Sequence, residues 1–505
     1  MNKVFWREGV ALIAFLLGIT SCSLQDNDRL EKALRAAGTN RVQLEAVLNH
    51  YRSDSLKEEA ARFLIENMPY HYSSEEYFVS PEGKTFRPDL LAYKDAGEME
   101  KCCDSLMRYG YSIHKNNRKD IVSLDSTFLI NNIELAFAAW QKPWAKDVSF
   151  IDFCRYILPY RSGQEMPSTL RKEIMERFTP LLDSAQVTTP LEACKILNER
   201  LAGVVRYSKT GLPFYPTIDE TYRAGYAQCE GMCDLGTYIM RAVGIPVAVD
   251  QTTWVKMDLG HRWCAVLTED HFESFAPGED QPGVHKQKFA EKRHRRPAKV
   301  YRSRFDPFLP VKNVKDDGYV TNLKSPLLYD VTDEYLNKPT DIRIGIDDKR
   351  AEENPSGQIY LCVYNHYRWL PIALGSRADT LCSFQRVVGD NIFMIADCPG
   401  GKEFRFITAP FYLSEEGAIH KFIPDMQHPQ TYTMKKRSNA LNQKHTLYYW
   451  NVDEKRFATV EYASATDSFH VYDRIPGNAL LWFTIPERVF NQRIFFLENG
   501  EIKRY

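Results

Sequence analysis

The sequence has no excess of charge of either sign and contains little cysteine. Its 65 Lys and Arg residues offset 66 Asp and Glu residues, and the net charge of −1 provides no overall positive field for a nucleic-acid partner. Eleven cysteines in 505 residues are too sparse for a small scaffold held together by disulfides. The sequence also lacks a run of about 18 apolar residues, an internal repeat and a low-complexity tract. Its function must therefore depend on local groups of residues.

The composition that remains is that of a folded protein with several domains. Hydrophobic residues make up 44% of the chain and charged residues 26%, which is ordinary for a globular protein and too apolar for a disordered one. At about 150 residues per domain, 505 residues correspond to roughly three domains. The length therefore predicts several regions with separate cores.

The first 22 residues have the order of an export signal. Lys3 and Arg7 precede an apolar run at 9–20, which is shorter than the roughly 20 residues needed to span a bilayer. The segment Ile19-Thr20-Ser21-Cys22 resembles the lipobox of bacterial lipoproteins. This resemblance implies a signal peptide at 1–22 and a lipid on Cys22 as the first mature residue. The expected location is the cell envelope, with the outer membrane as the anchoring membrane and the chain facing the periplasm or the cell surface.

Periodicity predicts a multidomain α+β protein. Helical spacing of apolar residues indicates a helical domain at 23–187, and mixed helix and strand patterns indicate an α+β core at 188–329. The region 330–505 is predicted to be β-rich, with one or two β-sandwich modules and a break near 415. Six short alternating or apolar runs carry this prediction, at 359–364, 391–396, 446–450, 456–462, 480–485 and 493–497.

The stretch around Cys229 carries the clearest chemical signal. Apolar residues follow it at helical spacing, at Met232, Leu235, Gly236, Ile239, Met240 and Val243. Gly244-Ile245-Pro246 then supplies a residue suited to a left-handed stop and a helix breaker. Cys229 is therefore expected at the start of a helix, where unsatisfied N–H groups and the helix dipole favour a nucleophilic thiolate. The same N–H groups could stabilise an oxyanion on an attacked carbonyl.

A candidate base follows on the next predicted strand. Alternation in the segment 260–267 places His261 and Trp263 on one strand face, 32 residues after Cys229. A cysteine at a helix start and a histidine on a following strand form the nucleophile and base of a thiol acyl-transfer site.

These motifs resemble the transglutaminase-like superfamily. The resemblance covers about 188–280 and rests on Cys229, on the segment 241–246 (Arg-Ala-Val-Gly-Ile-Pro) and on His261-Arg262-Trp263. It implies a papain-like core with Cys229 as the nucleophile and His261 as its base. More loosely, the whole chain is similar to multidomain transglutaminase-like lipoproteins of Bacteroides-type bacteria, in which a helical region precedes the core and β modules follow it.

The third catalytic position departs from that family. Where the family commonly has Phe-Asp-Pro, this chain has Ala276 between Phe275 and Pro277. Glu279 is the first candidate for the missing carboxylate because it follows the turn at Pro277-Gly278, and Glu273 and Asp280 are alternatives. A histidine can also be oriented by an amide or a backbone carbonyl. Candidates for the walls of the pocket are Gln228, Trp254 and Trp263, although core packing explains Trp254 equally well.

The sequence around Cys229 also allows two other interpretations. One is a buried structural thiol, since free cysteine is among the most buried residue types. The other is a zinc site made of Cys229, Cys233, His261 and Cys264. Strand alternation points His261 and Cys264 to opposite faces, which disfavours that set. The sequence therefore predicts no metal and no cofactor.

The resulting functional prediction is Cys-His acyl transfer or hydrolysis at an amide carbonyl of a peptide, protein or glycopeptide. The alternative is an inactive transglutaminase-like scaffold that binds glycan or peptide at the cell surface, which the missing Asp at Ala276 and the large β-rich region favour. Glycan contact by the C-terminal modules would use a stacking platform of Trp369, Trp450 and Trp482, whereas aromatics that alternate along strands are more often core.

Overall fold

A computed structural model describes most of the chain after residue 27. The described residues are 28–212, 214–258, 260–291, 295–308, 323, 325–336, 338–346, 358–398, 404–435, 446–461, 464–465, 469–484 and 493–505. The predicted signal peptide and Cys22 lie outside them. The chain divides into two compact units. Unit 1 consists of Met1–Val249, Trp263–Gly283 and Ser303–Pro307. Unit 2 consists of Asp250–Arg262, Val284–Arg302 and Phe308–Tyr505. The predicted core at 188–329 is thus shared between them, and the predicted domain boundaries stay predictions.

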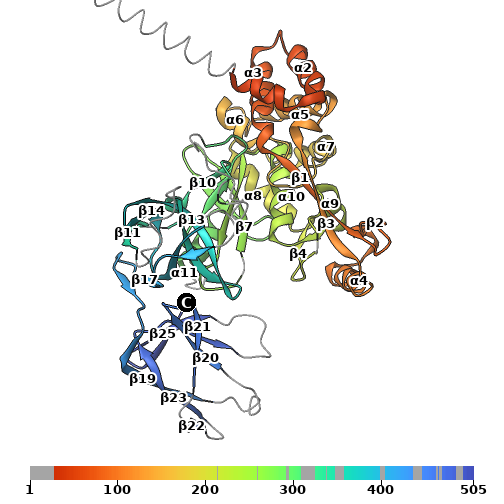
Figure 1. Cartoon of the computed structure of the whole chain (residues 1–505). Helices are drawn as coiled ribbons and strands as arrows, with labels where there is room; N and C mark the ends of the chain where they lie inside the picture. The colour runs from red at the N-terminus through yellow and green to blue at the C-terminus, as the bar shows by residue number, and fades with distance from the viewer. Residues whose placement is uncertain are drawn as a thin grey trace, which may run out of the picture. The chain divides into compact units, whose positions relative to one another are not determined.

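The N-terminal region is helical, as predicted (Figure 1). Aspartate or serine side chains cap several of its helices by accepting a first-turn N–H, as Asp125 does from the Phe128 amide at 2.8 Å. The inward faces of the helices before residue 68 and between residues 126 and 156 form one hydrophobic core, from Leu44 and Val47 to Phe153 and Ile157, whereas the last helix packs in a second core that includes Phe178. The helices are α2 (Arg41–His50), α3 (Ser55–Asn67), α5 (Ser126–Trp140), α6 (Phe150–Tyr156) and α7 (Arg171–Ser184), with short 3-10 turns at Gly38–Asn40, Met68–Tyr70, Leu90–Ala92 and Asp120–Val122.

A three-stranded sheet interrupts this helical region, and helical periodicity did not predict it. Its order is β2-β1-β3, with β1 at Tyr72–Val79, β2 at Thr85–Phe86 and β3 at Ser112–Lys119, and α4 (Ala96–Arg108) lies between β2 and β3 in sequence. Strands β1 and β3 pair antiparallel over their full length. All eight residues of β3 are exposed, so the strand carries no apolar alternation that sequence reasoning could detect.

The middle of the chain mixes helices and strands, also as predicted. A five-stranded sheet has the order β10-β9-β6-β7-β8, and β4 pairs with β5 in a separate short parallel sheet. Within unit 1, helix α10 contacts α5, α7, α8 and α9 and is buried from Gly231 to Ala242. The elements are α8 (Pro190–Leu201), β4 (Arg206–Tyr207), α9 (Ile218–Ala224), β5 (Tyr226–Ala227), α10 (Cys229–Ala242), β6 (Val247–Thr253), β7 (Gly260–Leu267), β8 (Phe272–Phe275), α11 (Val284–Glu291), β9 (Tyr301–Ser303) and β10 (Leu328–Asp330).

The C-terminal region is rich in strands, and each of the six predicted runs overlaps a strand. It forms an eight-stranded sheet, a three-stranded sheet β19-β23-β22 and a five-stranded sheet β21-β20-β24-β25-β26. The β-sandwich arrangement stays a prediction. The elements are α12 (Thr332–Tyr335), β11 (Thr340–Gly345), β12 (Gln358–Asn365), β13 (Arg368–Ala378), β14 (Leu381–Val387), β15 (Asn391–Asp397), β16 (Arg405–Phe406), β17 (Phe411–Leu413), β18 (Ile419–Lys421), β19 (Asp425–Lys435), β20 (Thr446–Asn451), β21 (Arg456–Val460), β22 (Ser464–Ala465), β23 (Phe469–Gly477), β24 (Leu481–Thr484), β25 (Ile494–Glu498) and β26 (Glu501–Arg504). Within the described ranges no helix is long and apolar enough to cross a membrane.

His71 makes the stability of unit 1 sensitive to acid. Its ring stacks on the Phe305 ring with centroids 4.0 Å apart, and its Nε2 lies 2.8 Å from the Phe305 carbonyl oxygen. Burial lowers the pKa of His71 from 6.5 to about 3. Below pH 6.5 the unfolded chain therefore takes up a proton that the folded chain does not, and stability falls by about 1.4 kcal/mol per pH unit from this residue.

We expect His71→Gln to remove this acid sensitivity, because an amide can donate to the same carbonyl without titrating. Urea midpoints at pH 7.5 and 4.5 should differ less in this variant than in the wild type. The exposed His50→Gln variant is the control and should keep the wild-type difference. Equal differences in all three proteins would contradict a buried neutral His71.

Candidate functional site

Cys229 lies at the first residue of α10, as the sequence predicts. Gln228 precedes it as the N-cap in an extended conformation, with φ −77° and ψ 175°. The Cys229 side chain is partly exposed, whereas α10 is buried from its third residue onward. The first-turn N–H groups of a helix lack acceptors within that helix, and the dipole there is positive. This position is suited to a thiolate and to an oxyanion formed beside it.

Helix α10 ends at Ala242, and Gly244 follows two residues later with the positive φ that the sequence predicts for it. Gly244 has φ +88°, and the Ile245 amide donates to the Met240 carbonyl at 2.9 Å. A Cβ on Gly244 would lie 2.4 Å from the Ala139 carbonyl oxygen of α5. Only glycine combines this φ with so close an approach. The helix is thus fixed against α5 at its C-terminal end.

Polar contacts hold the middle and the C-terminal end of α10 in place. The Asp234 carboxylate accepts a hydrogen bond from Ser162 Oγ at 2.7 Å and another from the Tyr215 hydroxyl. Arg241 donates from one terminal nitrogen to the Arg161 carbonyl at 2.7 Å and from Nε to the Val247 carbonyl at 3.0 Å. Three segments of unit 1 are therefore tied to the helix that begins at Cys229.

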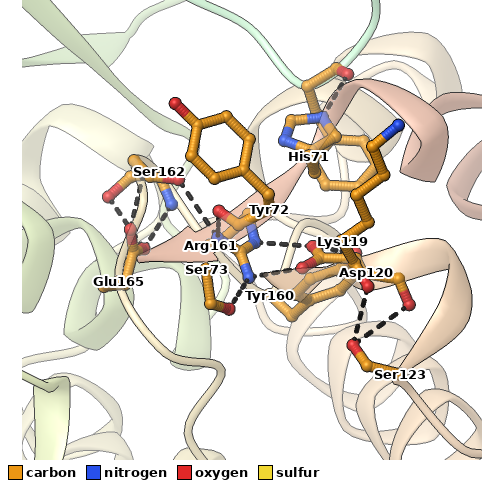
Figure 2. Close-up of polar contacts among 12 residues, drawn as sticks. His71, Tyr72, Ser73, Lys119, Asp120, Ser123, Tyr160, Arg161, Ser162 and Glu165 are labelled. Carbon is orange, nitrogen blue, oxygen red and sulfur yellow. Dashed lines mark hydrogen bonds and ion pairs between the residues drawn. The ribbon is translucent and has the colours of Figure 1, made fainter. Parts of the chain in front are cut away.

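A buried ion pair supports the segment that contacts α10 (Figure 2). Arg161 and Asp120 form a salt bridge at 2.7 Å, and their side chains are 1% and 0% exposed. Tyr160 donates to the Asp120 carboxylate at 2.8 Å, and Arg161 also donates to Ser73 Oγ at 2.9 Å. Burial raises the pKa of Asp120, and the charge of Arg161 offsets only part of that effect. The pair therefore depends on both partners being present.

A pocket of about 200 Å³ opens beside the start of α10. Its lining includes Gln228, Glu230 and Gly231, which flank Cys229 in sequence, together with the loop around Tyr215. Glu76 of β1 also lines it and accepts a hydrogen bond from the Tyr215 amide at 2.9 Å. Sequence reasoning named Gln228 but missed Glu76 and this loop, because only the fold brings strand β1 to α10.

The charges of Glu279 and Cys229 both influence the pKa of Tyr207 of β4. The pKa of the Tyr207 hydroxyl is raised, first by partial burial and then by the negative charges of Cys229 and Glu279. Glu279 itself is exposed in the turn after β8, where its amide donates to the Ala276 carbonyl at 3.0 Å. Of the two alternatives, the Glu273 carboxylate lies 2.9 Å from His271 Nε2, and the Asp280 carbonyl accepts from the Asn198 side chain at 3.0 Å. Tyr207 was not predicted.

His261 lies on β7 within unit 2 and is partly exposed. Trp254, a predicted pocket residue, stacks on its ring with centroids 5.6 Å apart and an interplanar angle of 20°. His285 of α11 lies against the same ring at 5.6 Å, and Phe289 contacts both Trp254 and His285. His285 was missed because its distance along the chain from His261 matches no motif. Unit 2 thus surrounds the candidate base with aromatic rings.

Trp263, also predicted to line the pocket, lies in the core, and its place in a pocket stays a prediction. Its side chain is fully buried, because β7 is covered on both faces from Trp263 to Val266. For Trp369, Trp450 and Trp482 the structure supports the core interpretation over the stacking platform. Trp369 and Trp450 are buried and pack edge-on with centroids 6.0 Å apart, so they belong to the core, and Trp482 packs partly buried beside them.

Cys233 and Cys264 are core thiols of unit 1. Cys264 Sγ lies 3.6 Å from the Cys233 carbonyl oxygen and 3.4 Å from Thr237 Oγ1. Burial raises the pKa of the Cys233 thiol well above its ordinary value. Within the part of the chain that the structure describes, no group of three or more His, Cys, Asp or Glu side chains could hold a metal ion.

Comparison with known proteins finds only remote similarity, among solved structures. No protein-family model and no curated protein matches the chain. Among solved structures it is similar to a "Putative Cysteine Protease from Cytophaga hutchinsonii", with a TM-score of 0.19 and 14% sequence identity. The match covers 22% of this chain and 37% of that one. A TM-score of this size assigns no fold, so the functional conclusion depends on the residues of this chain.

Proposed function

We propose that the protein catalyses thiol acyl transfer or hydrolysis at an amide carbonyl, with Cys229 as the nucleophile and His261 as its base. The Cys229 thiolate attacks the carbonyl carbon, and first-turn N–H groups of α10 stabilise the oxyanion. The C–N bond then breaks, and protonated His261 gives its proton to the leaving amine. Water or a second amine attacks the thioester, which releases the acyl group and restores the thiol.

One observation carries this proposal: the partly exposed thiol of Cys229 stands at the first residue of α10, beside a pocket. Cys102 and Cys398 are also partly exposed, but Cys102 lies within α4 and Cys398 follows strand β15, so neither stands at a helix start. The other seven described cysteines are buried, and burial raises the pKa of Cys194 and Cys233 well above the ordinary thiol value. Cys229 is therefore the thiol whose surroundings suit a nucleophile. Glu279 is the proposed third residue, and the proposal is supported by Tyr207, whose hydroxyl pKa is raised by burial and then by the charges of both Cys229 and Glu279.

The pH dependence of Cys229 alkylation by iodoacetamide tests the proposal. An ordinary thiol with a pKa near 8.5 gains about 200-fold in thiolate between pH 6 and 9. We expect the rate at Cys229 to change by less than about threefold over that range, because its thiol is already ionised at pH 6. His261→Gln should restore the steep rise and lower the rate at pH 6 by about tenfold. Peptide mass spectrometry measures each cysteine separately.

Cys102 and Cys398, which are also partly exposed, provide internal comparisons in the same samples. Glu279→Gln tests the third position by the same profile. A steep rise at Cys229 in the wild type that His261→Gln leaves unchanged would overturn the enzymatic proposal. That result would favour the alternative role, an inactive scaffold that binds glycan or peptide.

The proposed location is the cell envelope, and the proposed substrate is a peptide, protein or glycopeptide. The lipobox-like segment ending at Cys22 supports an export signal and a lipid anchor in the cell envelope. An exposed thiol and pocket suit a peptide, protein or glycopeptide substrate. The glycan contact of the C-terminal region stays a proposal without the tryptophan platform.

A further inference from the structure

The segment 254–258 joins β6 to β7 and comes immediately before the strand that carries His261. All of it belongs to unit 2, together with the strands of the C-terminal region. Three of its five residues contribute a backbone carbonyl, and the other two contribute a charged side chain, to contacts with those strands. We call this segment the His261 loop. Its contacts matter because Trp254, its first residue, stacks on the His261 ring.

Asn365, at the end of β12, binds both ends of the His261 loop. Its side-chain amide donates to the Trp254 carbonyl at 2.8 Å and to the Met257 carbonyl at 2.9 Å. Asn365 is 1% exposed, so water does not compete for these bonds. A single side chain from the strand-rich region thereby fixes the curvature of the loop.

Arg493, just before β25, holds the loop through charge. Its guanidinium donates to Asp258 Oδ1 at 2.7 Å, and the side chains are 8% and 3% exposed. The same guanidinium donates to the Val255 carbonyl, to the Tyr364 carbonyl at 2.7 Å and, through Nε, to the Tyr505 carbonyl at 3.0 Å. Lys256 adds a buried ion pair with Asp390. The planar guanidinium of Arg493 donates several hydrogen bonds in fixed directions, so it restricts the orientation of the His261 loop more than a lysine ammonium would.

The turn between β12 and β13 also conforms to the loop. His366 and Tyr367 have φ of +48° and +61°, a left-handed conformation that this kind of two-residue turn usually assigns to Asn-Gly. The His366 amide donates to Asp258 Oδ1 at 2.9 Å. Strained residues persist where surrounding contacts impose them. The unfavourable backbone conformation of this turn is therefore consistent with a turn held in place by its contacts with the His261 loop.

We infer that Arg493 and Asn365 are positioning residues for His261, and that the strand-rich C-terminal region is part of the candidate catalytic apparatus and not only an appended binding module. This inference rests on the proposed function. By fixing the His261 loop, the two residues hold Trp254 against the His261 ring, and so hold the imidazole in the orientation that keeps Cys229 ionised. Neither residue takes part in the chemistry itself.

The test compares full-length variants by the pH profile of Cys229 alkylation. Arg493→Lys keeps the positive charge but loses the paired nitrogens of the guanidinium. Asn365→Ala removes the two hydrogen bonds to the His261 loop and one to His366 Nδ1, without leaving a buried charge. Both should lower the rate at pH 6 by about tenfold and steepen the profile toward that of His261→Gln. The control is Arg405→Lys, which alters a second Arg–Asp pair in unit 2, with Asp397 at 2.9 Å between β16 and β15.

A merely structural role would lower the thermal midpoint of all three variants and leave their profiles like that of the wild type. That outcome, with His261→Gln still altering the profile, would overturn the inference and leave the proposed function standing. If His261→Gln itself has no effect, the proposed function fails and the inference fails with it. If Arg493→Lys does not fold, the Asn365→Ala profile decides the outcome alone.

Discussion

Replacing Arg161 with methionine is expected to lower the free energy of unfolding of unit 1 by about 3–5 kcal/mol, because it leaves a buried carboxylate without its charge partner. The Asp120 side chain is 0% exposed, and burial already raises its pKa. Without Arg161 that pKa rises further, so the carboxylate becomes protonated at a higher pH. The loss of stability should therefore be larger at pH 7.5 than at pH 5.

Urea unfolding followed by tryptophan fluorescence measures this loss. Arg161→Met combined with Asp120→Asn removes both charges and should recover part of the stability. Lys142→Met is the surface control, since the Lys142–Asp183 pair at 3.0 Å is 29% and 46% exposed and should contribute less than about 1 kcal/mol. A loss in Arg161→Met no greater than in Lys142→Met would contradict the role of the buried pair.

The Arg161 prediction also reaches the candidate site. The Arg161 carbonyl accepts a hydrogen bond from Arg241 of α10, and neighbouring Ser162 binds Asp234 of the same helix. Weakening this segment should therefore increase the mobility of α10 before the unit unfolds. The Cys229 alkylation profile of Arg161→Met, measured under native conditions, tests whether that mobility extends to the start of the helix.

Those parts of the site that depend on neighbours in sequence could be predicted. Apolar spacing and Gly244 together located α10, and Cys229 is its first residue because Gln228 is still extended. The six C-terminal strands were likewise found, since each combines apolar or alternating residues with nearby turn residues. Apolar spacing and turn residues depend on local conformation, and these elements have clear spacing and clear turn residues.

The parts that depend on long-range contacts could not be predicted. Nothing in the spacing of Asn365 or Arg493 indicates that they bind a loop more than 100 residues earlier in the chain. The burial of Trp263 could not be predicted for a related reason. Alternation along β7 places His261 and Trp263 on one face, but only tertiary packing determines that both faces are covered from Trp263 onward. Strand β3 was not predicted because all of its residues but Ile113 are polar and all are exposed, which is also typical of loops.

Gly244→Ala is expected to destabilise unit 1 by about 2–4 kcal/mol, which combines the cost of a left-handed φ with that of a steric clash. The new Cβ would lie 2.4 Å from the Ala139 carbonyl oxygen, which is backbone and can move only if α5 moves. Gly83→Ala is a matched control. Gly83 has φ +82°, and a Cβ there meets no atom within 4 Å, so this variant should show only the conformational cost of about 1 kcal/mol.

The difference between the two glycine variants isolates the contact of α10 with α5. Thermal midpoints and urea midpoints measure it, and the Cys229 alkylation profile shows whether a displaced C-terminal end of α10 alters its first turn. Equal losses of stability in both variants would mean that the Ala139 carbonyl does not constrain the helix. A larger loss in Gly244→Ala with an altered Cys229 profile would show that both ends of α10 move as one rigid element, so that the nucleophile depends on a glycine 15 residues away.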